Sequence, residues 1–273
     1  MSLLDDPCPI VRTALVSELQ RWEDSGIVLL REIAKDQHSV LAACAQAFLQ
    51  ELSDANPVKA FYNFIHSYSY ELETGSLMLS KTLGAKVDVG ACCSFLDEVA
   101  DRCKELFIEG SSPMEHCRVL NRVLFHEYGF VGDVEHMDNP ANTFIHSVIQ
   151  RRRGVPISLC IIYLLVAYRC NIGLEPVALP WRFVLGCYLG REPFFIDVFE
   201  RGTFRSYAGV ELLSAANGVD FHPSYLAPTS VADVLKSCCR NLEQQYTERK
   251  QMDNAQVFSG FLHEFDKAYH RHA

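Results

Sequence analysis

The sequence lacks an excess of positive charge. It contains 25 Lys and Arg residues against 34 Asp and Glu residues, which gives a formal net charge of −9 at pH 7. Its one basic run, Arg151-Arg152-Arg153, is more typical of a solvated helix end than of a phosphate site. Nucleic-acid-binding domains usually carry basic residues clustered along one face. We therefore expect no nucleic-acid partner.

Long hydrophobic runs are also missing. The most apolar stretch, residues 155–166, has about half of the roughly 20 residues that a membrane-spanning helix needs. The first ten residues contain Asp5, Asp6 and two prolines instead of a basic region followed by an apolar one, which argues against a secretory signal peptide. We expect a soluble, cytoplasmic protein with no membrane partner.

Spacings that are typical of metal sites are absent as well. The sequence has no Cys-x-x-Cys and no His-x-x-x-His, which are common ligand patterns. His126 and His136 lie near Glu127 and Glu135, but histidines that cap loops or face solvent explain this pattern more simply. We expect neither a metal nor a cofactor.

Cysteine, in contrast, is abundant. There are 11 cysteines, an odd number, and two pairs are adjacent, at Cys92-Cys93 and Cys238-Cys239. A disulfide framework would place cysteines in the loops of a small secreted chain, whereas most of these lie in apolar, helical patterns. The pattern therefore favours buried free thiols over disulfides.

The first 55 residues look helical and weakly repetitive. Residues 6–19 and 36–49 share an Asp, a β-branched residue, small residues and Leu at an offset of 30 positions. This pattern resembles HEAT-type helical repeats, and an ordinary helical hairpin would explain it equally well. Two repeats cannot bury both faces, so we expect this segment to pack on the domain that follows.

Beyond residue 55 the pattern predicts helices, then a small sheet, then helices again. Ser112, Pro113 and Glu115 mark a helix start, as cap, first helical residue and first-turn acid. Further helices are expected over 142–152, 157–173, 210–216, 231–249 and 254–270, and strands over 175–189 and 193–199. The arrangement is α+β, mostly helical with a small antiparallel sheet. We divide the chain into an N-terminal extension (1–55), a domain (57–247) and a C-terminal helix (248–273).

Several motifs in a fixed order carry a family resemblance. They are found at residues 120–130, 142–144, 152–159, 179–184 and 195–202, where the sequence reads LNRVLFHEYGF, NTF, RRGVPISL, LPWRFV and FIDVFERG. This series resembles the SirB-type branch of the transglutaminase-like superfamily over about residues 57–247. The resemblance implies a papain-like cysteine-hydrolase core preceded by the HEAT-like helices.

The resemblance also implies positions for a catalytic triad. In this fold the nucleophile lies at a helix N-terminus, which lowers a thiol pKa and supplies oxyanion-hole amides. A His on the first strand is the base, and an Asp on the next strand orients it. These positions correspond to Ser158, Arg182 and Asp197. Serine is common at the first position in this branch, but arginine stays protonated and cannot replace the histidine as a base.

Three further residues lie near the implied site. Cys160 follows Ser158 by two positions, about 200° around a helix, so we expect it to point into the core. Asn142 is interpreted either as a helix N-cap or as a pocket residue. Arg153 is interpreted either as a last-turn cation or as a pocket wall.

The sequence therefore favours a catalytically degenerate scaffold for binding or regulation. Strand alternation predicts that Arg182 points into the pocket, pairs with Asp197 and could hold a small anionic ligand, with Trp181 on the opposite face. The unknown partner is either such a ligand or a protein. Two alternatives remain: an active amide or peptide hydrolase with altered catalytic residues, and an interaction adaptor that uses the helical repeats.

Overall fold

The computed structural model describes residues 4, 8, 11, 14–16, 18–19, 22–35, 40–190 and 192–270. The chain divides into two compact units, Met1–Asn63 and Phe64–Ala273. In the first, helices α2 (Glu23–Ile33) and α3 (Val40–Ala55) contribute to a core of Leu19, Leu30, Ala45 and Phe48. Much of residues 6–19 and the link at 36–39 lies outside the described residues, so the HEAT-like assignment stays a prediction.

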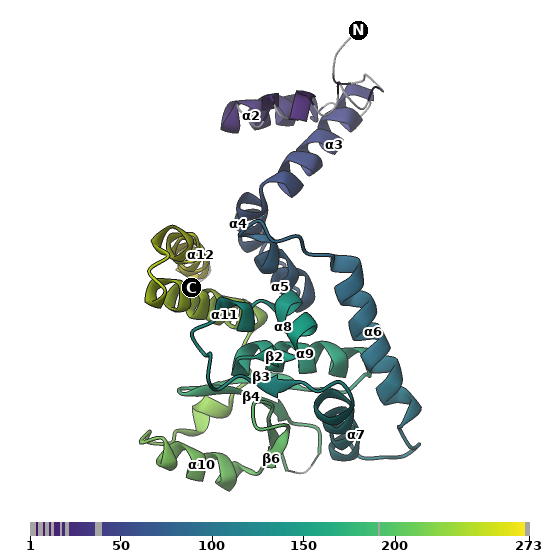
Figure 1. The fold of residues 1–273 in the computed structure, drawn as a ribbon, viewed down its shortest axis with the longest axis vertical. Coiled ribbons are helices and arrows are strands. Elements are labelled where there is room, and N and C mark those ends of the chain that lie inside the picture. Colours follow the sequence, from purple (N-terminus) through teal and green to yellow (C-terminus); the bar gives the residue numbers. More distant parts are fainter. Residues whose placement is uncertain are drawn as a thin grey trace. The chain divides into compact units, whose positions relative to one another are not determined.

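Helix α4 (Pro57–His66) carries the chain into the second unit, which holds the sheet and the remaining helices (Figure 1). Its helical elements are α5 (Leu72–Lys81), α6 (Val89–Glu105), α7 (Pro113–Asn121), the π-helix η2 (Arg122–Glu127), the 3-10 turn η3 (Pro140–Asn142), α8 (Ile145–Arg151), α9 (Pro156–Arg169), α10 (Tyr207–Ala216), the 3-10 turn η4 (Pro223–Leu226), α11 (Val231–Glu248) and α12 (Met252–His270). Its strands are β1 (Val131–Gly132), β2 (Arg153–Gly154), β3 (Glu175–Leu179), β4 (Arg182–Cys187), β5 (Phe194–Asp197) and β6 (Thr203–Arg205).

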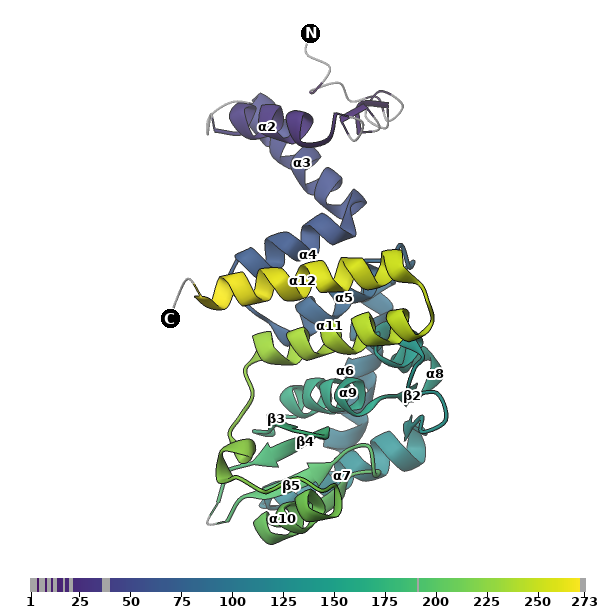
Figure 2. The ribbon, with the colours of Figure 1, turned by 90° about the vertical axis from the view of Figure 1, so that its left-hand side faces the viewer.

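Helix α9 is the central element of this unit. Its residues 157–167 are all buried, because it is apolar on every side. It packs against β3 and β4 on one side and against α11 on another, while α11 and α12 run side by side (Figure 2). Helix α9, which carries Ser158 in its first turn, therefore lies between the sheet and the helical layer.

The start of α7 agrees with the sequence prediction. Ser112 caps the helix by accepting a hydrogen bond from the Glu115 amide, and the Glu115 carboxylate accepts one from the Ser112 amide, with Pro113 at the first helical position. Such a reciprocal capping box satisfies two amides that would otherwise have no partner. Beyond Asn121 the helix continues as the π-helix η2.

The main sheet has the antiparallel order β3-β4-β5-β6. The expected strand over 175–189 is wrong, because this segment forms two strands that pair from Leu179↔Arg182 outward and are joined by a turn at Pro180 and Trp181. Proline ends a strand here since it has no amide hydrogen to donate and its φ is fixed. Strand β6 was not predicted. The α+β arrangement with a small antiparallel sheet is confirmed.

The sheet face toward α10 and η4 has its own core. The buried residues Val177, Val184 and Phe195 from the sheet pack with Val210 of α10 and Leu226 of η4. A tight turn after β5 is then fixed onto α7. Gly202 in this turn has φ +75°, its carbonyl accepts a hydrogen bond from Asn121 Nδ2 at 2.7 Å, and an added Cβ would lie 2.0 Å from Asn121 Oδ1. Only glycine fits that position.

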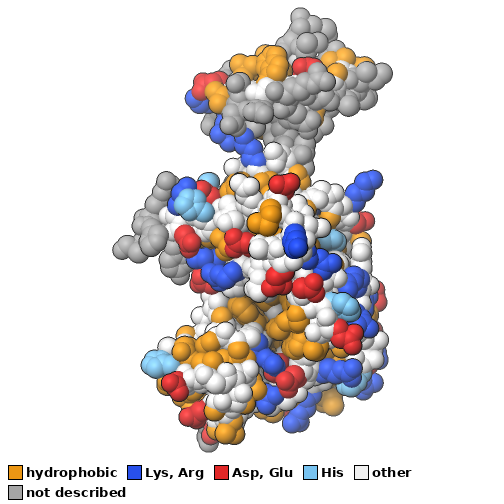
Figure 3. Space-filling view, turned by 60° about the vertical axis from the view of Figure 1, so that its left-hand side comes forward, with side chains coloured by type: hydrophobic (Ala, Val, Ile, Leu, Met, Phe, Trp, Pro, Cys, Tyr) orange, Lys and Arg blue, Asp and Glu red, His pale blue; other side chains and the backbone are white. Residues whose placement is uncertain are grey.

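The surface has mixed charge. Basic and acidic side chains are interspersed over the face drawn in Figure 3, without a continuous basic area. In the part of the chain that the structure describes, no helix is both long enough and apolar enough to cross a bilayer.

All 11 cysteines are free thiols in the structure. We expect thiol titration of the denatured, unreduced protein to recover all of them, because most are buried in helices or strands away from solvent oxidants. A parallel titration after reduction is the control and should give the same number. A higher number after reduction would show that a disulfide forms in solution and would contradict the prediction.

Candidate functional site

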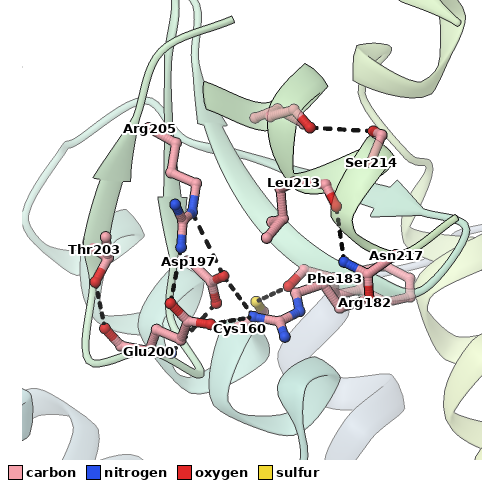
Figure 4. Close-up of polar contacts among 11 residues, drawn as sticks. Cys160, Arg182, Phe183, Asp197, Glu200, Thr203, Arg205, Leu213, Ser214 and Asn217 are labelled. Carbon is pink, nitrogen blue, oxygen red and sulfur yellow. Dashed lines mark hydrogen bonds and ion pairs between the residues drawn. The ribbon is translucent and has the colours of Figure 1, made fainter. Parts of the chain in front are cut away.

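The residues at the implied His and Asp positions meet in a cluster of four charged side chains (Figure 4). Arg182 Nη1 donates to Asp197 Oδ2 at 2.6 Å and to Glu200 Oε1 at 3.0 Å. Arg205 Nη2 donates to Glu200 Oε2 at 2.8 Å, and Arg205 Nε lies 3.9 Å from Asp197 Oδ2. The predicted pair between Arg182 and Asp197 is thus present, within a network of two cations and two anions.

Burial makes this network important for the fold. The Asp197 side chain is fully buried, and the Arg182 side chain is 20% exposed. Burial lowers the pKa of Arg182, but the charges of Asp197 and Glu200 and their hydrogen bonds outweigh it and raise the pKa above its ordinary value. Arg182 is therefore protonated near neutral pH and cannot accept a proton.

The predicted placement of Trp181 is wrong. Strand alternation would put it on the face opposite Arg182, but Trp181 lies in the two-residue turn before β4, where alternation does not apply. Its ring packs against the cluster that contains Leu179 and Val184, and its Nε1 is buried without a hydrogen-bond partner.

Ser158, at the implied nucleophile position, is occupied by backbone contacts. It lies in the first turn of α9 and is fully buried. Its Oγ donates to the carbonyl oxygens of Asn142 at 2.6 Å and Val155 at 3.0 Å. Neither Arg182 nor Asp197 is among its partners, so the structure does not join the three triad-equivalent residues in one hydrogen-bonded chain.

Cys160 is the α9 side chain that reaches toward the charged cluster. Its Sγ donates to the carbonyl of Phe183 on β4 at 3.6 Å (Figure 4). It is buried, as expected, but it points to the sheet next to the cluster and not away from it. Burial, together with the nearby charge of Asp197, raises its pKa well above the ordinary value. The thiol is therefore neutral and a poor nucleophile.

Asn142 belongs to a second buried polar network. Its Nδ2 donates to Asp133 Oδ2 at 3.1 Å and to the His136 carbonyl at 2.8 Å, and its Oδ1 accepts from Arg151 Nη1 at 2.8 Å. The expected helix start at Asn142 is wrong: η3 ends there, capped by Asn139, and α8 begins at Ile145. The Asn142 amide is turned inward because it pairs with the buried Asp133.

The three consecutive arginines serve three different purposes. Arg151 joins the Asn142 network. Arg152, in a left-handed conformation with φ 61°, stacks over the rings of Phe95 and Phe130. Arg153 is exposed at the start of β2, beyond the end of α8, so it is not a last-turn cation, and its assignment as a pocket wall stays a prediction. The run therefore forms no phosphate-binding cluster.

Asp133 is the acidic centre of the second network. Burial raises its pKa, but hydrogen bonds from His136 and Asn142 and the charges of His136 and Arg153 outweigh this effect, so the pKa is lowered. His136 Nδ1 lies 3.1 Å from Asp133 Oδ1, whereas His126 is exposed. Among the described residues, no group of three or more His, Cys, Asp or Glu side chains is arranged to hold a metal ion.

Two members of the charged cluster, Glu200 and Arg205, were missed by sequence reasoning. Glu200 follows the FIDVF segment, and Arg205 lies on β6, a strand of three residues that is too short to show an alternating pattern. The turn between them contains Arg201 with φ 52° and Gly202 with φ +75°. A negatively charged and a positively charged residue on either side of a glycine turn form the pattern that could have identified Glu200 and Arg205 as a pair.

Comparison with known proteins places the chain within a family. Residues 91–240, more than half of the chain, match the model of the transglutaminase-like superfamily. This range includes Ser158, Arg182 and Asp197. No solved structure matches the chain significantly.

Curated relatives match parts of the chain. The human F-box only protein 21 is 31% identical over 166 residues, which cover 57% of this chain and 26% of that protein. UPF0162 proteins from Xylella fastidiosa and Vibrio cholerae are 29% and 25% identical over 142 and 130 residues. Those alignments cover 50% and 47% of this chain, and 50% and 48% of the relatives. The chain thus spans about a quarter of the first relative and about half of the other two.

Proposed function

The chain belongs to the transglutaminase-like superfamily, and from this premise we propose that it is a catalytically degenerate member that uses the scaffold for binding or regulation. The observation that carries the proposal is the ion pair between Arg182 and Asp197. In an active triad the aspartate orients a histidine, and the histidine takes the proton of the nucleophile. Here the aspartate holds a guanidinium that has no proton-accepting atom.

The nucleophile side of the site supports the same conclusion. The hydroxyl of Ser158 donates to two backbone carbonyls, which hold it in place but cannot act as a base near neutral pH. Cys160, the nearby thiol, is kept neutral by burial and by Asp197. Among the described residues, no side chain that could act as a base is hydrogen-bonded to Ser158 or Cys160.

The proposed ligand is a small anionic group, such as a carboxylate, or an acidic side chain of a partner protein. Arg182 uses Nη1 for both carboxylates, which leaves its Nε and Nη2 hydrogens for a planar anion, and its side chain is still 20% exposed.

We also propose the finer assignments, a SirB-type branch with HEAT-like N-terminal helices and a cytoplasmic location. The free thiols of all 11 cysteines support that location.

Assay of the wild-type protein against a broad panel of amide, ester and glutamine-donor substrates tests the proposal. We expect no turnover above the uncatalysed rate, because among the described residues Ser158 Oγ and Cys160 Sγ donate hydrogen bonds only to backbone carbonyls, which cannot remove their protons. The Ser158→Ala and Cys160→Ala variants are the matched controls. Turnover by the wild type that either substitution abolishes would show that the chain is an active hydrolase with altered catalytic residues.

A further inference from the structure

A cavity of about 720 Å³ lies at the C-terminal end of α9. It is bordered by the start of α5, the last turns of α9, the start of β3 and the start of α11, all elements of the second unit (Figure 1). Tyr168 of α9 lines it, ten residues beyond Ser158, or about 15 Å along the helix axis. None of the residues of the charged cluster lines it, so the cavity is separate from the degenerate site.

The floor of the cavity is apolar and its rim is aromatic. Leu164, Leu174 and Val234 are buried side chains that line it. Tyr168 also lines it and is 81% exposed. Tyrosine side chains are usually more buried than this. The volume and this lining are typical of sites that hold a small molecule.

The charge of the lining has one sign. Three glutamates, Glu71, Glu73 and Glu175, line the cavity, and none of the lining residues that the structure describes is Lys, Arg or His. Glu73 is paired with Arg169 at 2.8 Å, and Glu71 accepts hydrogen bonds from the first amides of α5. Among the described residues, the Glu175 side chain has no hydrogen-bond or ion-pair partner. Glu175 is exposed, so its carboxylate is available to a positively charged ligand.

The outer edge of strand β3, beside the cavity, is already hydrogen-bonded to Thr229. The Thr229 amide donates to the Pro176 carbonyl at 2.8 Å, and the Ala178 amide donates to Thr229 Oγ1 at 2.9 Å. The outer edge of β3 is thus covered, and a peptide has no free strand edge to extend there. The recognition groups that remain are side chains: apolar residues, tyrosine faces and carboxylates.

We propose that this cavity binds a small organic cation, namely a protonated amine or guanidinium with an apolar body. The apolar body fills the space over the leucine and valine floor, and the cation lies between the carboxylate of Glu175 and the ring of Tyr168. A cation over a tyrosine ring and beside a carboxylate is attracted by both.

Ligand-observed NMR titration of the full chain with three matched probes tests this proposal. The probes are phenethylamine, the neutral phenethyl alcohol and the anionic hydrocinnamate. We expect saturable binding of the amine with a dissociation constant of roughly 1 mM or tighter, and weaker binding of the alcohol and the acid. Glu175→Gln and Tyr168→Ala should each weaken amine binding by roughly three- to fivefold.

Glu211→Gln on α10 is the matched control, because this glutamate is exposed and does not line the cavity. It should leave amine binding unchanged. Three results would overturn the proposal: no saturable binding of the amine, equal binding of the three probes, or binding that neither Glu175→Gln nor Tyr168→Ala weakens. Tighter binding of the capped tripeptide Leu-Lys-Leu than of the amine, weakened by Glu175→Gln, would identify a peptide site and also overturn it.

Discussion

Replacing Arg182 with alanine is expected to lower the free energy of unfolding by about 3 kcal/mol. The substitution removes the main cation beside Asp197, whose side chain is fully buried, and an unpaired buried carboxylate is costly. We expect the lower end of the range for buried pairs because the Arg182 side chain is one-fifth exposed. Arg205 compensates little, since its Nε lies 3.9 Å from the Asp197 carboxylate. Urea unfolding followed by the fluorescence of Trp181, in a Trp22→Phe background, measures the change close to the site.

A double-mutant cycle separates the ion pair from general effects of truncation. Asp197→Asn removes the charge of the partner, and in that background Arg182→Ala should cost much less than in the wild type. Arg240→Ala on α11 is the matched control, because Arg240 is exposed and helical, and it should change stability by no more than about 0.5 kcal/mol. A loss below about 1 kcal/mol for Arg182→Ala would mean that the pair behaves as a solvated surface pair.

This expectation gives the ion pair between Arg182 and Asp197 a structural role. A histidine in an active triad must remain able to gain and lose a proton, whereas the guanidinium of Arg182 is held by Asp197 and Glu200 in fixed geometry. The same strand positions that would hold a base and its orienting acid now join β4, β5 and the turn after β5. Under the proposed function, the arginine at the implied histidine position therefore forms a structural ion pair, and its side chain is still 20% exposed.

Local features of the sequence predicted the corresponding parts of the structure well. The capping box at Ser112 and Glu115 was predictable because both partners lie within one helical turn. The pairing of Arg182 with Asp197 was predictable from the family resemblance, which placed the two residues on neighbouring strands, and from the cost of an unpaired buried charge. In each case a short-range rule or an ordered set of motifs determined the geometry.

Features that depend on packing between distant segments could not be predicted. A proline between two apolar stretches fits either a strand edge or a turn, and only the pairing of Leu179 with Arg182 selects the turn. The direction of Cys160 depends on where β4 lies against α9. Asn142 has the sequence context of a helix cap, but its amide is turned inward by Asp133, which lies just after strand β1.

Replacing Asn142 with alanine is expected to destabilise the protein by roughly 2–4 kcal/mol at pH 7. The side chain is fully buried, and its amide donates to Asp133 and to the His136 carbonyl while its oxygen accepts from Arg151. The alanine variant removes one hydrogen-bond donor from the buried Asp133 carboxylate and the acceptor of Arg151, whose side chain is 35% exposed and can bond to water instead. Urea unfolding measures the loss. Asn254→Ala on α12 is the control, because among the described residues no hydrogen bond is made by the Asn254 side chain.

The destabilisation by Asn142→Ala should also depend on pH, because Asn142 is one of the groups that lower the pKa of Asp133 below its ordinary value of 3.8. A carboxyl group with a lowered pKa in the folded state stabilises that state at pH values above the pKa of the group in the unfolded chain. This stabilisation is lost as the pH falls through the pKa of the group in the folded state. Without Asn142 the folded pKa of Asp133 rises, so the variant loses part of that stabilisation. The difference from wild type is then largest near neutral pH and shrinks as the pH falls below 3.8 and through the folded pKa of Asp133. In an Asp133→Asn background the effect of Asn142→Ala should no longer vary over this pH range. A difference that stays constant with pH in both backgrounds would mean that Asn142 acts by packing alone and does not hold the charge of Asp133.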